Sequence, residues 1–265
     1  MQLVTLTTDW GYSDHYIGVV KSKLYRTIKD CQVVDITHSI EKYNMMEGAF
    51  VVRNACLEFP KGTIHIIDID CNEGGMNDYK HVLIVYNEQY FICTNNGMPS
   101  LIFEDLEQIK IINITKVLQD SSFYTFPALD LFCNVATLIS DKTDINEFGE
   151  QETELVKRNI FTPTIYSDLM LCTVFHIDSY GNVFLNITIN EFQKGLGKKN
   201  FSIKMDRYNI TKISSSYDNV KENNPLLTVA STGHMQIAIN KANASELFGL
   251  KYGSQITIQL KDEKQ

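Results

Sequence analysis

The first 140 residues alternate between short apolar runs and stretches with apolar residues at helical spacing. The run at 3–8 predicts a buried strand, and the run at 63–70, nearly continuous in apolar character, predicts another. Between them, the spacing predicts a helix that Ser13 or Asp14 could cap, and a second helix over 45–59. The same pattern predicts strands at 32–38, 81–87, 89–95 and 109–115 and a helix at 128–140. This alternation is typical of an α/β domain with a mostly parallel sheet between helices.

The pattern changes after residue 140. A polar stretch without a clear period ends near Pro163, and it reads as a connector. The segments beyond it predict short strands at 171–178, 181–188, 200–205, 226–232, 235–240 and 254–260, with one late helix inside 241–253. Many short strands with a single helix favour a small β-barrel. We therefore expect an α/β domain over 1–150, a linker over 151–165 and a C-terminal β-barrel domain over 166–265.

Composition and charge exclude several classes of function. The chain has 265 residues and a formal net charge of −8, so it lacks the basic surface that a nucleic-acid partner needs. No apolar run is long enough to span a membrane, and the first residues lack a secretory pattern. The six cysteines are scattered, mostly in apolar runs, which indicates free thiols rather than disulfides or zinc ligands. We expect a soluble cytoplasmic protein without a nucleic-acid or membrane partner.

Three acids, Asp9, Asp35 and Asp70, stand at the ends of predicted parallel strands, where such sheets bind ligands. Asp9 and Asp14 flank the first strand-to-helix turn. They either bond the turn and cap the helix, or they meet hydroxyl or ammonium groups of a ligand. His38, just past a strand end, either secures a loop or belongs to the site.

Two further loops carry polar side chains. Asp68, Asp70 and Glu73 could hold Mg²⁺, but alternating acids are a weak metal signal and we expect no metal. Asn95 and Asn96 precede a glycine, which fits either a bare turn or a ligand contact.

The segment 178–186 is the most informative stretch of the C-terminal part. Its alternating positions carry an acid, two aromatic rings and two amides, so one face of a strand could bind a ligand. The alternative is a hairpin with Gly181 at its turn. The residues are Asp178, Tyr180, Asn182, Phe184 and Asn186.

Six stretches resemble, in order and spacing, the S-adenosylmethionine (SAM) hydroxide adenosyltransferase family, which includes fluorinases and chlorinases. They are "TDWGYSDHYIGVVK", "VVDITHSIEKYNMMEGAFVV", "FPKGTIHIIDID", "NNGMPS", "IDSYGNVFLNIT" and "IAINKANASELFGLKYGS". The resemblance implies an N-terminal α/β domain, a C-terminal β-barrel and a homotrimer. In that trimer, SAM lies between the N-terminal domain of one subunit and the C-terminal domain of its neighbour.

The resemblance also implies roles for single residues. Asp9 would hold the ribose hydroxyls, Asp14 and Asp178 the methionine ammonium, and Ser231 the methionine carboxylate. Adenine would be enclosed by Tyr180, Asn182, Phe184 and the backbone near Asn240 and Lys241. Tyr43 would lie against the ribose, and Asn95 completes the expected binding set. SAM, adenosine and methionine are then the expected small-molecule ligands, and no separate cofactor is expected.

The implied reaction is displacement at C5′ of the sulfonium with release of methionine. In water-using members an Asp, an Arg and a His lie beside the attack position. Asp70 matches the acid, whereas Asn77 stands at the expected arginine, and "TFPALD" places Pro127 and Leu129 where "TFHGRD" has His and Arg.

Three functions remain open. The first is a SAM hydrolase that forms adenosine and L-methionine with an atypical catalytic set centred on Asp70. The second is a catalytically inactive protein that binds SAM or adenosine. The third is a halide-using adenosyltransferase, which an anion such as Asp70 beside the attack path disfavours. Cys71 and Glu73 could supply replacement chemistry.

Overall fold

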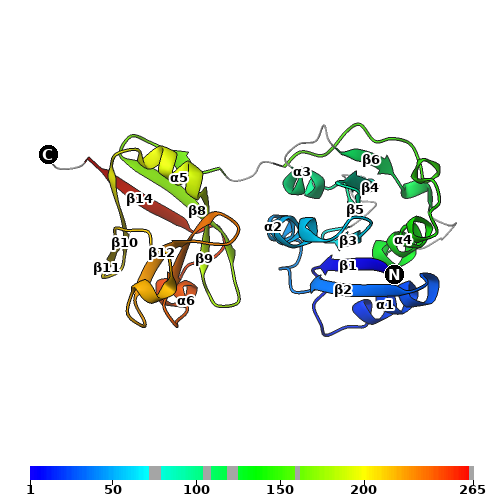
Figure 1. Cartoon of the computed structure of the whole chain (residues 1–265), viewed down its shortest axis with the longest axis horizontal. Helices are drawn as coiled ribbons and strands as arrows, with labels where there is room; N and C mark the ends of the chain where they lie inside the picture. The colour runs from blue at the N-terminus through cyan, green and yellow to red at the C-terminus, as the bar shows by residue number, and fades with distance from the viewer. Residues whose placement is uncertain (72–78, 104–108, 118–124, 159–161, 263–265) are drawn as a thin grey trace. The chain divides into compact units, whose positions relative to one another are not determined.

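The computed structural model describes residues 1–71, 79–103, 109–117, 125–158 and 162–262. The chain forms two compact units, residues 1–159 and 160–265 (Figure 1). We describe each unit by itself. The exact domain bounds expected from the sequence stay a prediction.

Unit 1 contains a six-stranded sheet in the order β2-β1-β3-β5-β4-β6. The first four strands in this order run parallel, whereas β4 pairs antiparallel with both β5 and β6. This confirms the expected mostly parallel sheet. The strands are β1 (Gln2–Thr8), β2 (Cys31–Thr37), β3 (Ile64–Asp68), β4 (His81–Tyr86), β5 (Gln89–Thr94) and β6 (Lys110–Asn113).

Helices cover both faces of this sheet (Figure 1). Side chains alternate between the two faces along a strand, so Ile64 and Ile66 lie on the same face. This face packs against α1 (Tyr16–Thr27) and α4 (Cys133–Ser140). The other face packs against the remaining helices, α2 (Met45–Ala55) and α3 (Met98–Ile102). The sheet is therefore buried on both sides, which explains why its strands are nearly continuous apolar runs.

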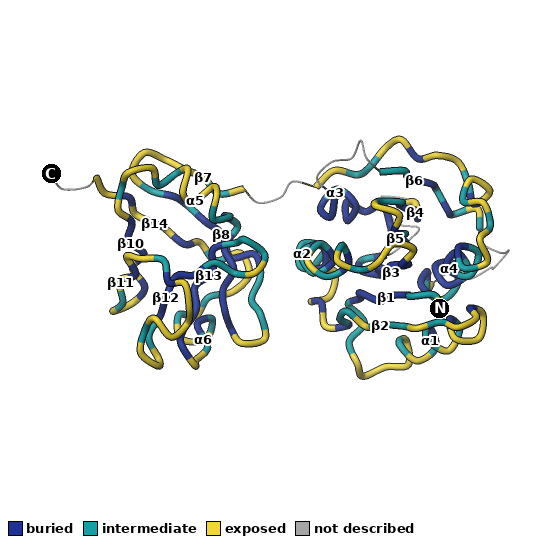
Figure 2. The backbone as a smooth tube through the Cα atoms, in the orientation of Figure 1, coloured by how far each residue is buried: buried dark blue, intermediate teal, exposed yellow. Residues whose placement is uncertain are grey.

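Unit 2 is an antiparallel sheet in the order β11-β10-β14-β8-β9-β13-β12, with β7 added beside β8. It curves into a nearly closed barrel around one apolar core, so the expected β-barrel is confirmed. Figure 2 shows the buried stretches along its strands. The strands are β7 (Thr164–Ile165), β8 (Leu169–Ile177), β9 (Val183–Thr188), β10 (Asn200–Met205), β11 (Tyr208–Ile210), β12 (Pro225–Val229), β13 (His234–Ile239) and β14 (Gln255–Lys261).

The described residues of unit 2 form two α-helices, so the expectation of one late helix is wrong. The late helix is α6 (Ala244–Phe248), and α5 (Ile189–Leu196) comes before it. A capping box starts α5: the Thr188 side chain accepts from the Glu191 amide, and the Glu191 carboxylate accepts from the Thr188 amide. The spacing T-x-x-E is visible in the sequence and could have revealed this helix.

All six cysteines are free thiols. Five are buried and Cys31 is half-buried, which agrees with their apolar surroundings in the sequence. Within the part of the chain that the structure describes, no helix is both long and apolar enough to cross a membrane.

Candidate functional site

The turn after β1 is tied to the turn before α2. The Tyr43 amide donates a hydrogen bond of 2.8 Å to Oδ2 of Asp9. The Gly11 amide donates one of 2.7 Å to the carbonyl of His38. Tyr43 has a φ of 66°, in the left-handed region, and its side chain is 63% exposed. Asp9 therefore shapes this turn and still presents a carboxylate beside an exposed aromatic ring.

His38 lies beneath the same turn and is fully buried. Its Nδ1 is 2.7 Å from the hydroxyl of Thr8, and its ring stacks on Trp10 at 5.9 Å between centroids. Its Nε2 is 3.2 Å from Oδ1 of Asp35. The other oxygen of Asp35, Oδ2, accepts a 2.5 Å hydrogen bond from Lys21. Burial lowers the pKa of His38, and Asp35 opposes that effect. The geometry favours the interpretation that His38 secures a loop.

Asp14 does not cap the first helix. Helix α1 begins at Tyr16, and its N-cap is His15, with no side-chain cap hydrogen bond. The expected cap at Ser13 or Asp14 is therefore wrong, because the chain continues through a bend before the helix starts. Asp14 is exposed and makes no hydrogen bond to another described residue, so the cap alternative no longer accounts for it. Its role towards an ammonium group stays a prediction.

Asp70 lies close to Asp9 because β3 pairs with β1 and Thr8 stands opposite Asp68. The φ of Asp70 is 51°, so the chain bends sharply just past the strand end. Burial and the negative charge of Asp9 raise the pKa of the Asp70 carboxyl, and Arg158 opposes them. Two expected site residues of unit 1 are thus electrostatically coupled at one edge of the sheet.

Asp68 is a second buried acid beside this edge. Burial raises its pKa to about 6, and the backbone amide of Ala128 donates a hydrogen bond to it. Its Oδ2 has no hydrogen-bond partner among the described residues. Across those same residues, no cluster of three His, Cys, Asp or Glu side chains could hold a metal ion, and Glu73 lies outside them.

The positions that depart from the family pattern lie partly outside the described structure. Asn77 belongs to the residues that the structure does not describe. Pro127 is buried and directly precedes a π-helical turn, Ala128–Phe132, that leads into α4. The carbonyl of Leu129 accepts a 2.7 Å hydrogen bond from Lys23. Neither Pro127 nor Leu129 has a side chain that can take up or release a proton.

Asn95 holds a distant segment of unit 1. Its Nδ2 donates to the carbonyl of Glu154 at 2.8 Å, and its Oδ1 accepts from the amide of Val156 at 3.0 Å. Both polar atoms of the side chain are therefore bonded to the backbone of the expected linker. Its assignment to ligand binding stays a prediction.

The segment from Asp178 to Asn182 is a turn, so the expected strand face over 178–186 is wrong. Oδ1 of Asp178 accepts from the amides of Tyr180 (3.0 Å) and Asn182 (2.9 Å), and Oδ2 accepts from the Asn182 side chain (2.9 Å). Gly181 has a φ of 78°, and β9 begins only at Val183. Asp and Asn side chains that bond nearby backbone amides favour turns over strands.

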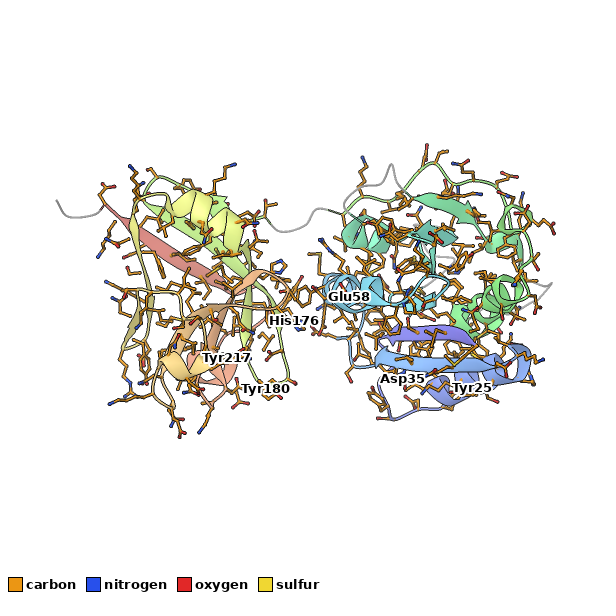
Figure 3. All side chains as sticks on the ribbon, in the orientation of Figure 1. Tyr25, Asp35, Glu58, His176, Tyr180 and Tyr217 are labelled. Atoms are coloured by element: carbon orange, nitrogen blue, oxygen red, sulfur yellow. The ribbon has the colours of Figure 1, made fainter. Side chains whose placement is uncertain are left out.

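An open cavity of about 610 Å³ lies beside this turn. Four expected contacts line it, namely Tyr180, Asn182, Asn240 and Lys241. Tyr217 also lines the cavity, and Figure 3 shows it on the same side of unit 2 as Tyr180. Two exposed aromatic rings beside amides and backbone are suited to a flat, polar-edged ligand such as adenine.

Two other expected residues of unit 2 lie away from this cavity lining. Phe184 is buried, and its ring meets His176 edge-on at 5.2 Å. Ser231 is exposed in the turn between β12 and β13, whereas the cavity lies at the other end of β13. A six-residue strand separates these two ends by about 20 Å. The roles of Phe184 and Ser231 stay predictions.

Tyr217 and Asn243 line the cavity but were not expected from the sequence. The Tyr217 hydroxyl donates to Oε1 of Gln236 at 3.0 Å, which orients the ring. Asn243 caps α6, and a Cβ atom on Gly181 would lie 2.0 Å from its Oδ1. A lone tyrosine in the polar stretch "SSSYDN" was the available signal for Tyr217.

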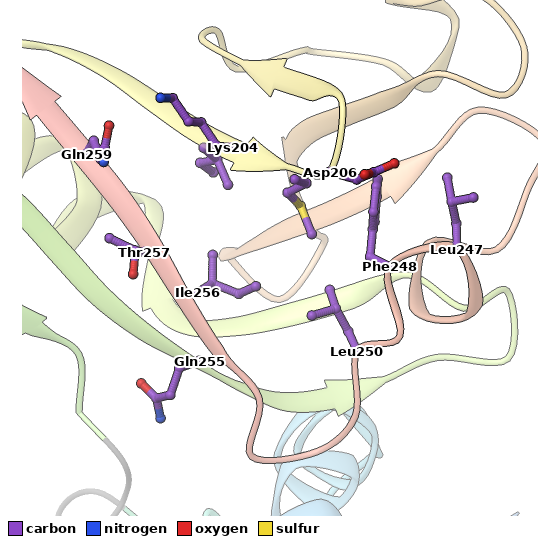
Figure 4. A pocket seen from close by; sticks show the side chains of 11 residues that line it. Lys204, Asp206, Leu247, Phe248, Leu250, Gln255, Ile256, Thr257 and Gln259 are labelled. Carbon is purple, nitrogen blue, oxygen red and sulfur yellow. The ribbon is translucent and has the colours of Figure 1, made fainter.

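A second cavity in unit 2, of about 420 Å³, contains none of the expected site residues. It lies between β10, β14 and the end of α6, as Figure 4 shows. Its lining mixes apolar side chains, such as Met205 and Phe248, with polar ones, such as Lys204 and Gln255.

Comparisons with known proteins identify the family of this chain. Residues 4–149 match the SAM hydroxide adenosyltransferase N-terminal domain, and residues 172–257 match the corresponding C-terminal domain. A relative from Methanocaldococcus jannaschii, named (R)-S-adenosyl-L-methionine hydrolase, is 28% identical, covering 97% of this chain and 96% of the relative. A fluorinase from an Actinoplanes species is 21% identical, covering 97% of each chain.

A solved structure shares the fold. The crystal structure of an uncharacterized conserved protein from Thermotoga maritima has a TM-score of 0.85 and 24% identity, covering 97% of this chain and 99% of the other. The two family matches extend over most of the chain and include both units. The chain therefore belongs to the SAM hydroxide adenosyltransferase family.

Proposed function

We propose that this protein is a SAM hydrolase that cleaves SAM at C5′ to adenosine and L-methionine. The observation that carries the proposal is the pairing of Asp9 and Asp70 at adjacent ends of β1 and β3, in a chain of this family. In the proposed site, Asp9 binds the ribose and Asp70 acts on the nucleophile. Relatives named (R)-S-adenosyl-L-methionine hydrolase support the same activity.

The reaction needs an oriented water rather than a general acid. The water oxygen forms a bond to C5′ while the C5′–S⁺ bond breaks, and the electron pair of that bond stays on the sulfur of methionine. The water loses a proton, which Asp70 accepts and passes to solvent. Because the sulfonium leaves as a neutral thioether, Asp70 is the one proton acceptor that this mechanism uses.

Binding uses the charge and shape of SAM. The acids Asp9, Asp14 and Asp178 suit its hydroxyl and ammonium groups, and the cavity beside Tyr180 and Tyr217 suits its adenine. SAM is the substrate, and the proposal includes no separate cofactor.

The reaction is tested with purified protein, SAM and H₂¹⁸O. We expect adenosine that carries ¹⁸O as its 5′ oxygen, together with methionine. The products are separated by chromatography and their masses are measured by mass spectrometry. Asp70→Asn should slow this reaction by about 10²- to 10⁴-fold, the range for loss of one general base. Its SAM affinity, measured by calorimetry, should stay close to that of the wild type.

The products that form distinguish the hydrolase from the inactive binding protein and the halide-using enzyme. Tight SAM binding without any adenosine would contradict the hydrolase and leave the inactive binding protein. A 5′-halogenated nucleoside formed in the presence of chloride or fluoride would instead identify a halide-using enzyme. Adenosine without ¹⁸O would exclude attack of water on C5′.

The assembly is also part of the proposal. We infer that the protein is a homotrimer whose sites lie between subunits, as the family resemblance implies. Light scattering coupled to size exclusion should give three times the chain mass of 30.3 kDa. A protein that is monomeric under the assay conditions and still hydrolyses SAM would contradict sites that lie between subunits.

A further inference from the structure

Arg158 lies near the C-terminal end of unit 1 and contacts Asn96 and Gly97. The backbone that leads to it crosses residues 95–100, where Asn95 bonds both Glu154 and Val156. The Arg158 amide then donates a 3.0 Å hydrogen bond to the hydroxyl of Ser100. The polar residues of "NNGMPS" therefore hold this segment in place, and Arg158 stands at its end.

Gly97 makes room for the arginine side chain. A Cβ atom at this position would lie 2.2 Å from Cγ, 3.0 Å from Nε and 3.1 Å from Cδ of Arg158. The φ of Gly97 is 108°, a conformation that other residues rarely adopt. The absence of a side chain thus lets the stem of Arg158 lie directly on the backbone before α3.

The guanidinium and Asp70 share one partner, Asn96. The Nε of Arg158 donates to the Asn96 carbonyl at 3.3 Å. The Asn96 side chain donates to the carbonyls of Asp70 (2.9 Å) and Ile69 (3.1 Å). Asn96 is fully buried, so its backbone and side chain form a buried link between the two charged residues.

We propose that Arg158 is a positioning residue for Asp70: through their shared partner Asn96 it holds the acid in place and adds a positive charge to its surroundings. The proposal rests on the function proposed above. In this proposal Arg158 is the cation near Asp70. The position at which the family pattern has an arginine is occupied by Asn77, which carries no charge.

The electrostatic balance around Asp70 explains why such a charge matters. Among the described residues, the charged groups that act on Asp70 are Asp9 and Arg158. Burial and Asp9 raise the pKa of Asp70 and so favour the protonated form, which cannot act as a base. The positive charge of Arg158 lowers the pKa of Asp70 and so opposes both effects.

The test compares Arg158→Gln and Arg158→Lys with Lys157→Gln. Lys157 is the adjacent exposed cation, and no hydrogen bond ties it to Asn96, so it is a matched control for loss of one surface charge. The pH profile of kcat for adenosine formation is measured for each variant. In Arg158→Gln the acidic limb should move to higher pH, with a several-fold loss of kcat below neutral pH. Arg158→Lys and Lys157→Gln should keep the wild-type profile.

Two outcomes would overturn the proposal. One is a pH profile of Arg158→Gln that matches Lys157→Gln. The other is an effect confined to KM, which would assign Arg158 to binding the substrate instead.

A second measurement separates this proposal from the proposed function. The Asp70 carboxyl is titrated by ¹³C NMR, with Asp70→Asn identifying its signal. The midpoint should rise in Arg158→Gln and not in Lys157→Gln, whether or not the protein hydrolyses SAM. An unchanged midpoint would contradict the role of Arg158, whereas a wild-type protein that forms no adenosine would contradict the proposed function alone.

Discussion

The Tyr43 amide donates a 2.8 Å hydrogen bond to Oδ2 of Asp9, joining the loop after β1 to the loop before α2. The other oxygen of Asp9, Oδ1, makes no hydrogen bond to a described residue and can accept one from a ligand. A single carboxylate thus orders a loop and offers an acceptor to ribose. These two tasks can be separated by substitution.

Asp9→Asn should weaken SAM binding by about 10-fold or more, because a carboxylate that accepts from a ligand contributes about 1.5–3 kcal/mol. The asparagine oxygen can still accept from Tyr43, so thermal stability should change little. Calorimetric titration with SAM measures the first effect and a melting curve the second. Asp9→Ala, which loses both acceptors, should also lower the melting temperature. Equal SAM affinity of Asp9→Asn and wild type would remove Asp9 from the binding site.

Tyr217→Leu should reduce adenosine affinity several-fold, since an aromatic contact contributes about 0.5–1.5 kcal/mol beyond its buried area. The control is Tyr166→Leu, because Tyr166 is likewise partly exposed but does not line the cavity beside Tyr180. Equilibrium dialysis with labelled adenosine measures both variants. A loss of affinity in both, or in neither, would mean that this cavity is not the adenine site.

Asp68→Asn should change how stability depends on pH. Because the Asp68 pKa is raised to about 6 from 3.8, the folded protein holds this proton more tightly than the unfolded chain. The resulting stabilisation is complete below about pH 3.8 and is lost as the pH rises through 6. The full difference is about 3 kcal/mol, of which about 1 kcal/mol falls between pH 5 and pH 8.

Urea unfolding of both proteins at pH 5 and pH 8 measures this effect. The wild type should lose about 1 kcal/mol relative to Asp68→Asn between the two conditions. Burial lowers the pKa of His65 to about 3, which acts in the opposite direction, but His65 is present in both proteins and cancels. Parallel pH dependences of the two proteins would show that Asp68 titrates normally in the folded state.

Gly97→Ala should destabilise unit 1 by more than Gly62→Ala. Both glycines have left-handed backbone, with φ of 108° and 83°, so both substitutions carry a backbone strain of about 1–3 kcal/mol. Only at Gly97 would the new Cβ also collide with Arg158, because nothing lies within 4 Å at Gly62. Thermal unfolding compares the two variants. Equal losses of stability would mean that the Arg158 side chain does not lie on Gly97.

The sequence alone predicted most of the described strands and helices, but not β7, β11 or α3. It succeeded where a local pattern reports whether a segment is buried on one face or on two. It also placed Asp9 and Asp70 correctly just past strand ends, whereas Asp35, expected at a strand end, lies inside β2. The helix α5 was missed although its capping box, Thr188 to Glu191, is written in the sequence. This helix is short and lies between two strands, so the strand pattern dominates its surroundings in the sequence.

Only the tertiary structure decided which distant residues share a site. Spacing suggested that Asp14 caps a helix and that Asp178 lies on a strand, whereas α1 begins at Tyr16 and Asp178 closes a turn. Arg158 and Tyr217 carried no motif, and their positions follow from Gly97 and Gln236, which are far from them along the chain. Local periodicity reports the environment of a segment, but contacts across many residues arise only when the whole chain packs.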